Sequence, residues 1–125
     1  DEHRARIGVT PTLIHFAALL VGALAMLAPL SNIARAVALG VIGCAGLAYL
    51  VNLALLASKR IKDEERDTLW FGVLPMAAYA GFLVTGAAWA IAPEYAPEIG
   101  GFASVVLLVA ALHNSWEMTL IIIGR

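Results

Sequence analysis

The sequence predicts an all-α integral membrane protein that folds as a four-helix up-and-down bundle. Of its 125 residues, 62% are hydrophobic and only 14% are charged. In typical soluble domains about a quarter of the residues are charged. The few charges are clustered, which leaves four apolar runs of more than twenty residues each. Each run is long enough to cross the hydrocarbon core of a bilayer, which is about 30 Å thick. A soluble domain, a disordered chain and a disulfide scaffold are therefore poor alternatives, the last because the sequence has one cysteine.

The four runs are expected to be helices, because lipid offers the backbone no hydrogen-bond partners and the runs lack the alternation of barrel strands. Their ends carry helix stop and start signals. Pro29 ends the first run, and Ser31 or Asn32 can cap the second. Pro97 and Glu98 suit the first turn of the fourth, where a missing N–H is harmless and a carboxylate meets the helix dipole. In a single domain, residues 1–125, the expected helices are 4–30, 32–57, 68–92 and 98–123.

Short connectors between the runs predict antiparallel neighbours, so both termini are expected at one end of the bundle. Seven of the eight Lys and Arg residues fall at that end, and only Arg35 falls opposite. Because Lys and Arg favour the cytoplasmic side, both termini are expected to be cytoplasmic. Aromatic residues near the run ends fit an interfacial belt, namely Trp70, Trp89, Tyr95 and Trp116.

The chain resembles itself when it is shifted by 64 residues. About eight identities fall in 22 positions, and Pro11 then lies over Pro75. Proline matches carry weight because they mark backbone geometry. Pro75 is expected well inside the third helix, so Pro11 is expected inside the first. A two-residue adjustment further along places Asn52 over Asn114. The match predicts a duplicated two-helix hairpin, and chance alignment of Ala- and Leu-rich helices is the alternative. The two units would be 1–62 and 63–125.

Polar side chains inside the apolar runs are the candidate functional residues, because polar groups in lipid are costly. Glu117 is a candidate proton or cation site, and His113 precedes it by four residues and can pair with it. His15 and Asn52 are expected at a similar depth, so one polar layer is possible. Glu117 and Asn114 are expected on the face that points into the bundle. In the alternative, Glu117 reaches the nearby interface, and the two asparagines only form hydrogen bonds between helices.

Small side chains recur every four residues along the second run, and similar spacing appears in the third. Small residues let transmembrane helices approach closely. Packing, rather than reactivity, is the expected role of the lone cysteine, which we expect to be buried. The residues predicted to serve helix packing are Ala36, Gly40, Cys44, Ala48 and Gly81.

No cofactor is predicted, and haem is the alternative. His15 and His113 are the histidines inside the runs, and a bis-histidine haem would need their imidazoles to face each other across a large cavity. No Cys/His metal spacing, phosphate loop or Ser/His/Asp pattern is readable from the spacing.

The segment His113-Asn114-Ser115-Trp116-Glu117, followed by Met and Thr, resembles the Asn-Ala-Trp-Asp endings of small uncharacterised bacterial four-span membrane proteins. The resemblance covers about seven residues, and Ser115 and Glu117 depart from the pattern. It implies a bacterial cytoplasmic membrane and no particular activity.

These observations favour a small transport or channel-type membrane protein with Glu117 as its ionisable group. It is expected to work as a homo-oligomer or beside another membrane protein, with permeation between protomers. A non-catalytic membrane subunit or scaffold is the alternative, a haem protein is the third, and an enzyme is least supported. The expected partners are the lipid bilayer and membrane proteins, and nucleic acid is not expected.

Overall fold

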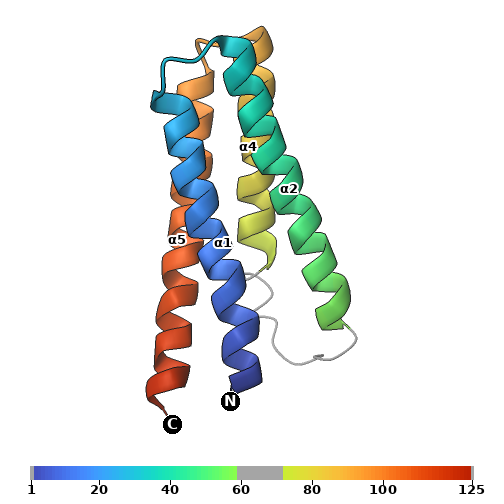
Figure 1. The fold of residues 1–125 in the computed structure, drawn as a ribbon, viewed down its shortest axis with the longest axis vertical. Helices are drawn as coiled ribbons and strands as arrows, with labels where there is room; N and C mark the ends of the chain where they lie inside the picture. Colours follow the sequence, from blue (N-terminus) through green and yellow to red (C-terminus); the bar gives the residue numbers. More distant parts are fainter. Residues whose placement is uncertain (1, 59–71, 125) are drawn as a thin grey trace.

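The computed structural model describes residues 2–58 and 72–124 as four helices (Figure 1), with side chains described over 10–55 and 72–124. No strand occurs in these segments. All four helices are long and apolar enough to cross a membrane, which makes the chain a candidate multi-pass membrane protein. The helices are α1 (Glu2–Leu27), α2 (Asn32–Ser58), α4 (Leu74–Ile91) and α5 (Ala96–Ile123).

The helices run alternately up and down, so α1 begins and α5 ends at the same end of the bundle (Figure 1). Going round the bundle, α2 packs on α4, α4 on α5 and α5 on α1. The contact of α1 with α2 is the smallest of the four, and α2 leans away from α1 toward the end with the termini (Figure 1).

Local sequence signals set the starts of two helices, and the predicted position of Pro11 in a third is confirmed. The hydroxyl of Ser31 accepts a hydrogen bond from the backbone N–H of Ala34 at 3.1 Å, so Ser31 caps α2, one of the two residues expected there. Pro97 and Glu98 lie in the first turn of α5, as predicted. Pro11 lies inside α1, also as predicted.

Pro75 does not lie well inside its helix in the described part of the chain. It occupies the first turn of α4, and Gly72 and Val73 immediately before it are π-helical. A proline in the first turn costs little, because its missing N–H would have no partner there. The predicted helix start at residue 68, the polar connector 58–67 beyond Ser58 and the belt residue Trp70 lie outside the described residues.

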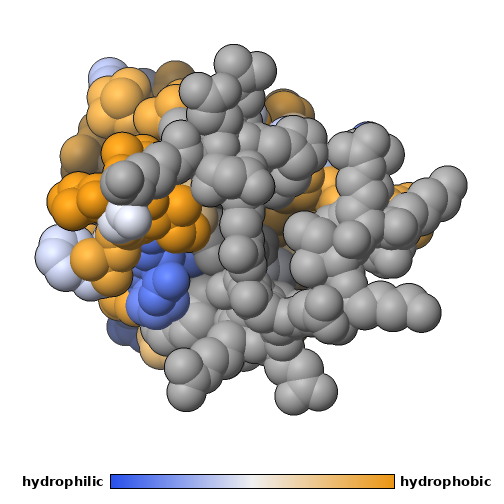
Figure 2. Space-filling view, turned by 90° about the horizontal axis from the view of Figure 1, so that it is seen from below, coloured by the Kyte–Doolittle hydropathy of each residue, from blue (hydrophilic) through white to orange (hydrophobic). Residues whose placement is uncertain are grey.

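The outside of the bundle is apolar along its length. Large hydrophobic side chains are exposed on every helix, for example Leu24, Val41, Val84 and Val109. Seen from the end with the termini, much of the surface of the described residues is hydrophobic, with hydrophilic groups left of the centre of the view (Figure 2). A surface of this kind suits acyl chains rather than water.

The most extensive helix contact is that of α2 with α4, and glycines make it possible. A Cβ on Gly43 would lie 2.9 Å from the carbonyl oxygen of Tyr79, and a Cβ on Gly46 would overlap the Tyr79 ring. A Cβ on Gly86 would lie 2.9 Å from the carbonyl oxygen of Ala36. The two backbones can therefore approach only because these positions lack side chains.

The predicted small-residue face of α2 is only partly the packing face. Ala36 and Gly40 are half-buried next to α4, but Cys44 and Ala48 are exposed, so the expected burial of Cys44 is wrong for the described chain. Steps of four residues turn the face by about 40° each time, since a helix has 3.6 residues per turn. The buried positions instead alternate steps of four and three, at Leu39, Gly43, Gly46 and Leu50.

We expect Gly43→Ala to destabilise the bundle by about 1–3 kcal/mol, because the added methyl group must displace α4. Gly40→Ala is the matched control on the same helix, since a Cβ there meets nothing within 4 Å. It should be neutral or stabilising by up to about 1 kcal/mol from helix propensity. Reversible unfolding in mixed detergent, followed by far-UV circular dichroism, measures both. Equal stability of the two variants would contradict the packing described here.

Candidate functional site

The centre of the bundle contains a hydrogen bond between two fully buried side chains. His15 Nδ1 lies 2.8 Å from the Tyr79 hydroxyl, which links α1 to α4 across the bundle. The Tyr79 ring rests on Gly46 of α2 and lies 6.1 Å from the Phe82 ring between centroids. One side chain thereby ties together three of the four helices.

The second ring nitrogen of His15 has a different environment. Nε2 is buried and has no hydrogen-bond partner among the described residues. A neutral imidazole has one donor and one acceptor nitrogen, and a tyrosine hydroxyl can serve either role at Nδ1. Uncompensated burial of a polar atom costs about 1–3 kcal/mol, so the His15–Tyr79 bond offsets only part of the cost of burying this ring.

Other buried polar groups include Thr85 and Asn114. The Thr85 hydroxyl donates to the carbonyl of Gly81 in its own helix at 2.7 Å. Asn114 is fully buried on the face of α5 that turns inward. The interior of the described bundle thus contains uncharged polar groups, and its largest buried side chains are Tyr79, Phe82, Leu39 and Leu107.

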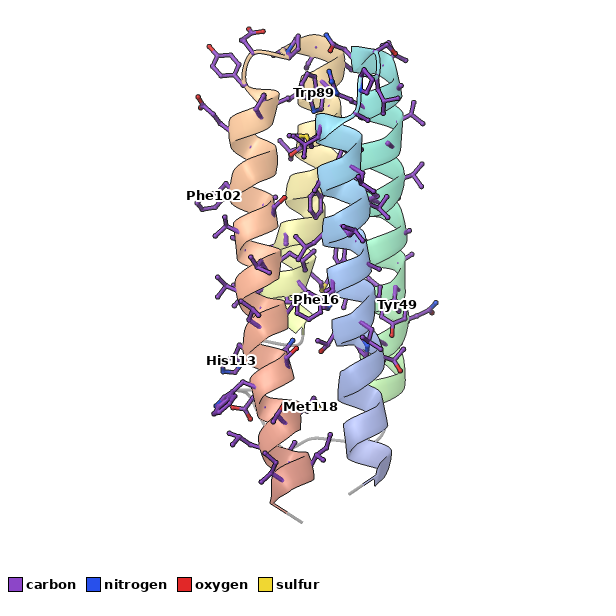
Figure 3. The ribbon with its side chains drawn as sticks, turned by 60° about the vertical axis from the view of Figure 1, so that its left-hand side comes forward. Phe16, Tyr49, Trp89, Phe102, His113 and Met118 are labelled. Carbon is purple, nitrogen blue, oxygen red and sulfur yellow. The ribbon has the colours of Figure 1, made fainter. Side chains whose placement is uncertain are left out.

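The ionisable pair of α5 lies outside this interior. His113 Nε2 is 3.9 Å from Glu117 Oε1, the pairing expected from their spacing, and the side chains are 33% and 43% exposed. His113 projects away from the bundle, whereas Met118 lies on the side of α5 that faces α1 (Figure 3). The expectation that Glu117 points inward with Asn114 is wrong, because the Glu117 side chain is 43% exposed whereas Asn114 is fully buried. Three residues turn a helix by about 300°, so Glu117 lies about 60° from Asn114, at the edge of the buried face. Met118 continues the buried face instead.

The predicted polar layer does not form as one cluster. His15 is buried against Tyr79, Glu117 is paired with His113 at the surface, and Asn52 is exposed on α2. The candidate residues therefore occupy three separate environments.

A second polar cluster, which sequence reasoning missed, lies at the opposite end. Arg35 Nη2 donates to the carbonyl of Ala28 at 2.9 Å, and its guanidinium lies 4.8 Å from the Trp89 ring centroid. The Trp89 indole N–H lies 3.3 Å from the sulfur of Met26. The sequence feature that could have revealed this cluster is Arg35 itself, because it is the one Lys or Arg expected at this end of the bundle. Its interactions here fasten the ends of α1 and α4 to the start of α2.

The arrangement does not favour the bis-histidine haem alternative. His15 bonds to Tyr79 inside the bundle, and His113 pairs with Glu117 on the outside, so the two imidazoles do not face each other. Among the described residues no group of three or more His, Cys, Asp or Glu side chains is placed to hold a metal ion.

The described residues form a four-helix bundle with four candidate membrane spans, with imidazole, hydroxyl and amide groups in its interior and a partly exposed His–Glu pair on α5. Comparisons with protein-family models, with curated proteins and with solved structures found no match to this chain.

We expect Tyr79→Phe to destabilise the bundle by about 1–3 kcal/mol, because it leaves both ring nitrogens of His15 without a partner. Tyr95→Phe is the control, since Tyr95 is exposed in the turn between α4 and α5. It should change stability by less than about 0.5 kcal/mol. Chemical unfolding in detergent measures both, and a Tyr79→Phe variant as stable as the control would show that the bond contributes nothing.

Proposed function

We propose that this protein is a transport or channel-type subunit that works in an assembly of chains, with the His113–Glu117 pair as its proton or cation site. The observation that carries the proposal is the position of this pair. It lies within the candidate span of α5 and on the outside of the bundle.

The cost of leaving such a pair in lipid supports an assembly. A carboxylate at the centre of a bilayer costs at least about 2.5 kcal/mol, and ionisable groups in spans face protein or water in nearly all cases. Glu117 lies six residues before the end of α5 at Ile123, about 9 Å along the axis. A neighbouring chain that covers this surface would remove the group from lipid. The centre of the described bundle is filled by large side chains, which favours a path between chains over one through it.

The second candidate is a non-catalytic membrane subunit, and the same surface pair favours it. As part of such a subunit, the His113–Glu117 pair would pack against a partner protein and fix where the partner binds. The pair would then transport no ion. Recovery of a stoichiometric partner in detergent supports this candidate, and self-association alone argues against it.

The proposed location is the bacterial cytoplasmic membrane with both termini in the cytoplasm. The orientation rests on charge, because seven of the eight Lys and Arg residues belong to the termini or to the connector between α2 and α4. Such residues favour the cytoplasmic side. The antiparallel helices support a common side for these segments (Figure 1).

We also propose that the chain arose by duplication of a two-helix hairpin. Buried positions repeat at an offset of 64 residues in both hairpins, which places His15 over its own hydrogen-bond partner Tyr79. The repeat favours an ungapped offset, so Leu50 rather than Asn52 corresponds to Asn114. The pairs in which both residues are buried include Pro11 and Pro75, Gly22 and Gly86, Leu39 and Ala103, Gly43 and Leu107, Gly46 and Ala110, and Leu50 and Asn114.

For transport, we expect Glu117→Gln to reduce proton or monovalent-cation flux in proteoliposomes to the level of protein-free vesicles, because the amide cannot carry the charge. Glu94→Gln is the matched control, since Glu94 is an exposed acid in the turn at the other end of the bundle. Flux is followed with an internal pH dye and with cation-selective electrodes. Unchanged flux in Glu117→Gln would remove this carboxylate from the mechanism, and a wild-type chain without flux would favour the second candidate.

For duplication, aligned sequences of close relatives provide the test. Residues 64 positions apart should be more alike than residues 62 or 66 apart, because only the ungapped offset superposes the buried faces. Equal similarity at the three offsets would contradict a duplicated hairpin.

A further inference from the structure

An open groove of about 360 Å³ runs along the outside of the bundle between α4 and α5. Its floor forms where the two helices touch, since a Cβ on Gly81 would lie 2.8 Å from the Cβ of Ala103. Phe102 projects outward at the edge of the groove (Figure 3). The groove lies between two candidate membrane spans, so it faces the region that acyl chains occupy.

One end of the groove carries a charge. Glu98 is the charged residue of the lining and lies in the first turn of α5. No ion pair to Glu98 occurs among the described side chains, residues 10–55 and 72–124. Arg35, at the same end of the bundle, is already engaged by the Ala28 carbonyl and the Trp89 ring. The carboxylate of Glu98 is therefore available to a cation that comes from outside the chain.

We propose that this groove binds a phospholipid whose headgroup carries a primary ammonium. The ammonium pairs with Glu98, and one acyl chain lies along the apolar lining as far as Val106. Glu98 and Val106 are eight residues apart, about 12 Å along the helix. The acyl chain of the bound lipid would therefore run from the headgroup level at Glu98 into the hydrocarbon region. The neighbouring Tyr95 is 58% exposed, and an exposed tyrosine suits the headgroup level.

Charge, rather than apolar contact, gives the site its selectivity. Lipid tails are as apolar as the groove, so apolar contact alone does not distinguish one lipid from another. An exposed ion pair does distinguish an ammonium from an anionic headgroup, and its modest strength corresponds to a preference of about two- to fivefold. A second copy of the chain is a weaker occupant, because Arg35 is the one Lys or Arg among the described side chains and it is already engaged within its own chain.

The test is native mass spectrometry of the full-length, delipidated protein. The protein is titrated with phosphatidylethanolamine, phosphatidylglycerol and phosphatidylcholine of identical acyl chains. We expect phosphatidylethanolamine to bind about two- to fivefold more tightly than phosphatidylglycerol. The preference should disappear in Glu98→Gln and persist in Glu94→Gln, whose acid lies outside the groove lining.

A second variant separates the groove from a general surface effect. Ala77→Phe fills the groove from its exposed edge and leaves the helix contact at Gly81 intact. It should reduce binding of all three lipids at this site. Equal affinities for the three lipids in the wild type, or an unchanged preference in Glu98→Gln, would overturn the proposal. Loss of dimers without loss of bound lipid in Ala77→Phe would assign the groove to a second copy and also overturn it.

Discussion

The close approach of α2 to α4 is the constraint on which the rest of the bundle depends. Gly43 and Gly46 let the α4 backbone and the Tyr79 ring lie directly against α2. In that position the Tyr79 hydroxyl lies 2.8 Å from His15 Nδ1. A side chain at either glycine would move the ring and break the link from α1 to α4. In lipid the hydrophobic effect does not hold helices together, so packing of this kind and a few buried hydrogen bonds must do so.

The bundle buries one imidazole, a hydroxyl and an amide, and leaves its His–Glu pair partly exposed. His15, Thr85 and Asn114 are fully buried, whereas the His113–Glu117 pair is partly exposed on α5. A buried charge needs a partner and several hydrogen bonds, and otherwise costs far more than a buried amide or hydroxyl. The surface position of the pair therefore leaves the fold of the single chain undisturbed. It also places any charge-dependent function at the contact between the chain and its surroundings.

The sequence predicted the parts of the structure that rest on strong local contrast. Long apolar runs indicated four spans, and Ser31, Pro97 and Glu98 marked helix ends correctly. It did not predict which side of each helix faces the core, because nearly every residue of an apolar run is apolar and no polar face marks the outside. The four-residue stripe containing Cys44 and Ala48 consequently failed, as did the inward orientation of Glu117. The partner of His15 was also missed, although the 64-residue offset already placed Tyr79 over it.

The two proposed sites share one flank of α5 and still leave room for each other. Ile99 of the groove and Glu117 are 18 residues apart, which is five complete turns, so Glu117 lies on the same flank of α5 as the groove. The groove ends at Val106, and the eleven residues from there to Glu117 span about 16 Å. A partner chain can therefore cover Glu117 without displacing a lipid held at Glu98. Because of this separation, loss of the lipid preference and loss of ion flux are independent results.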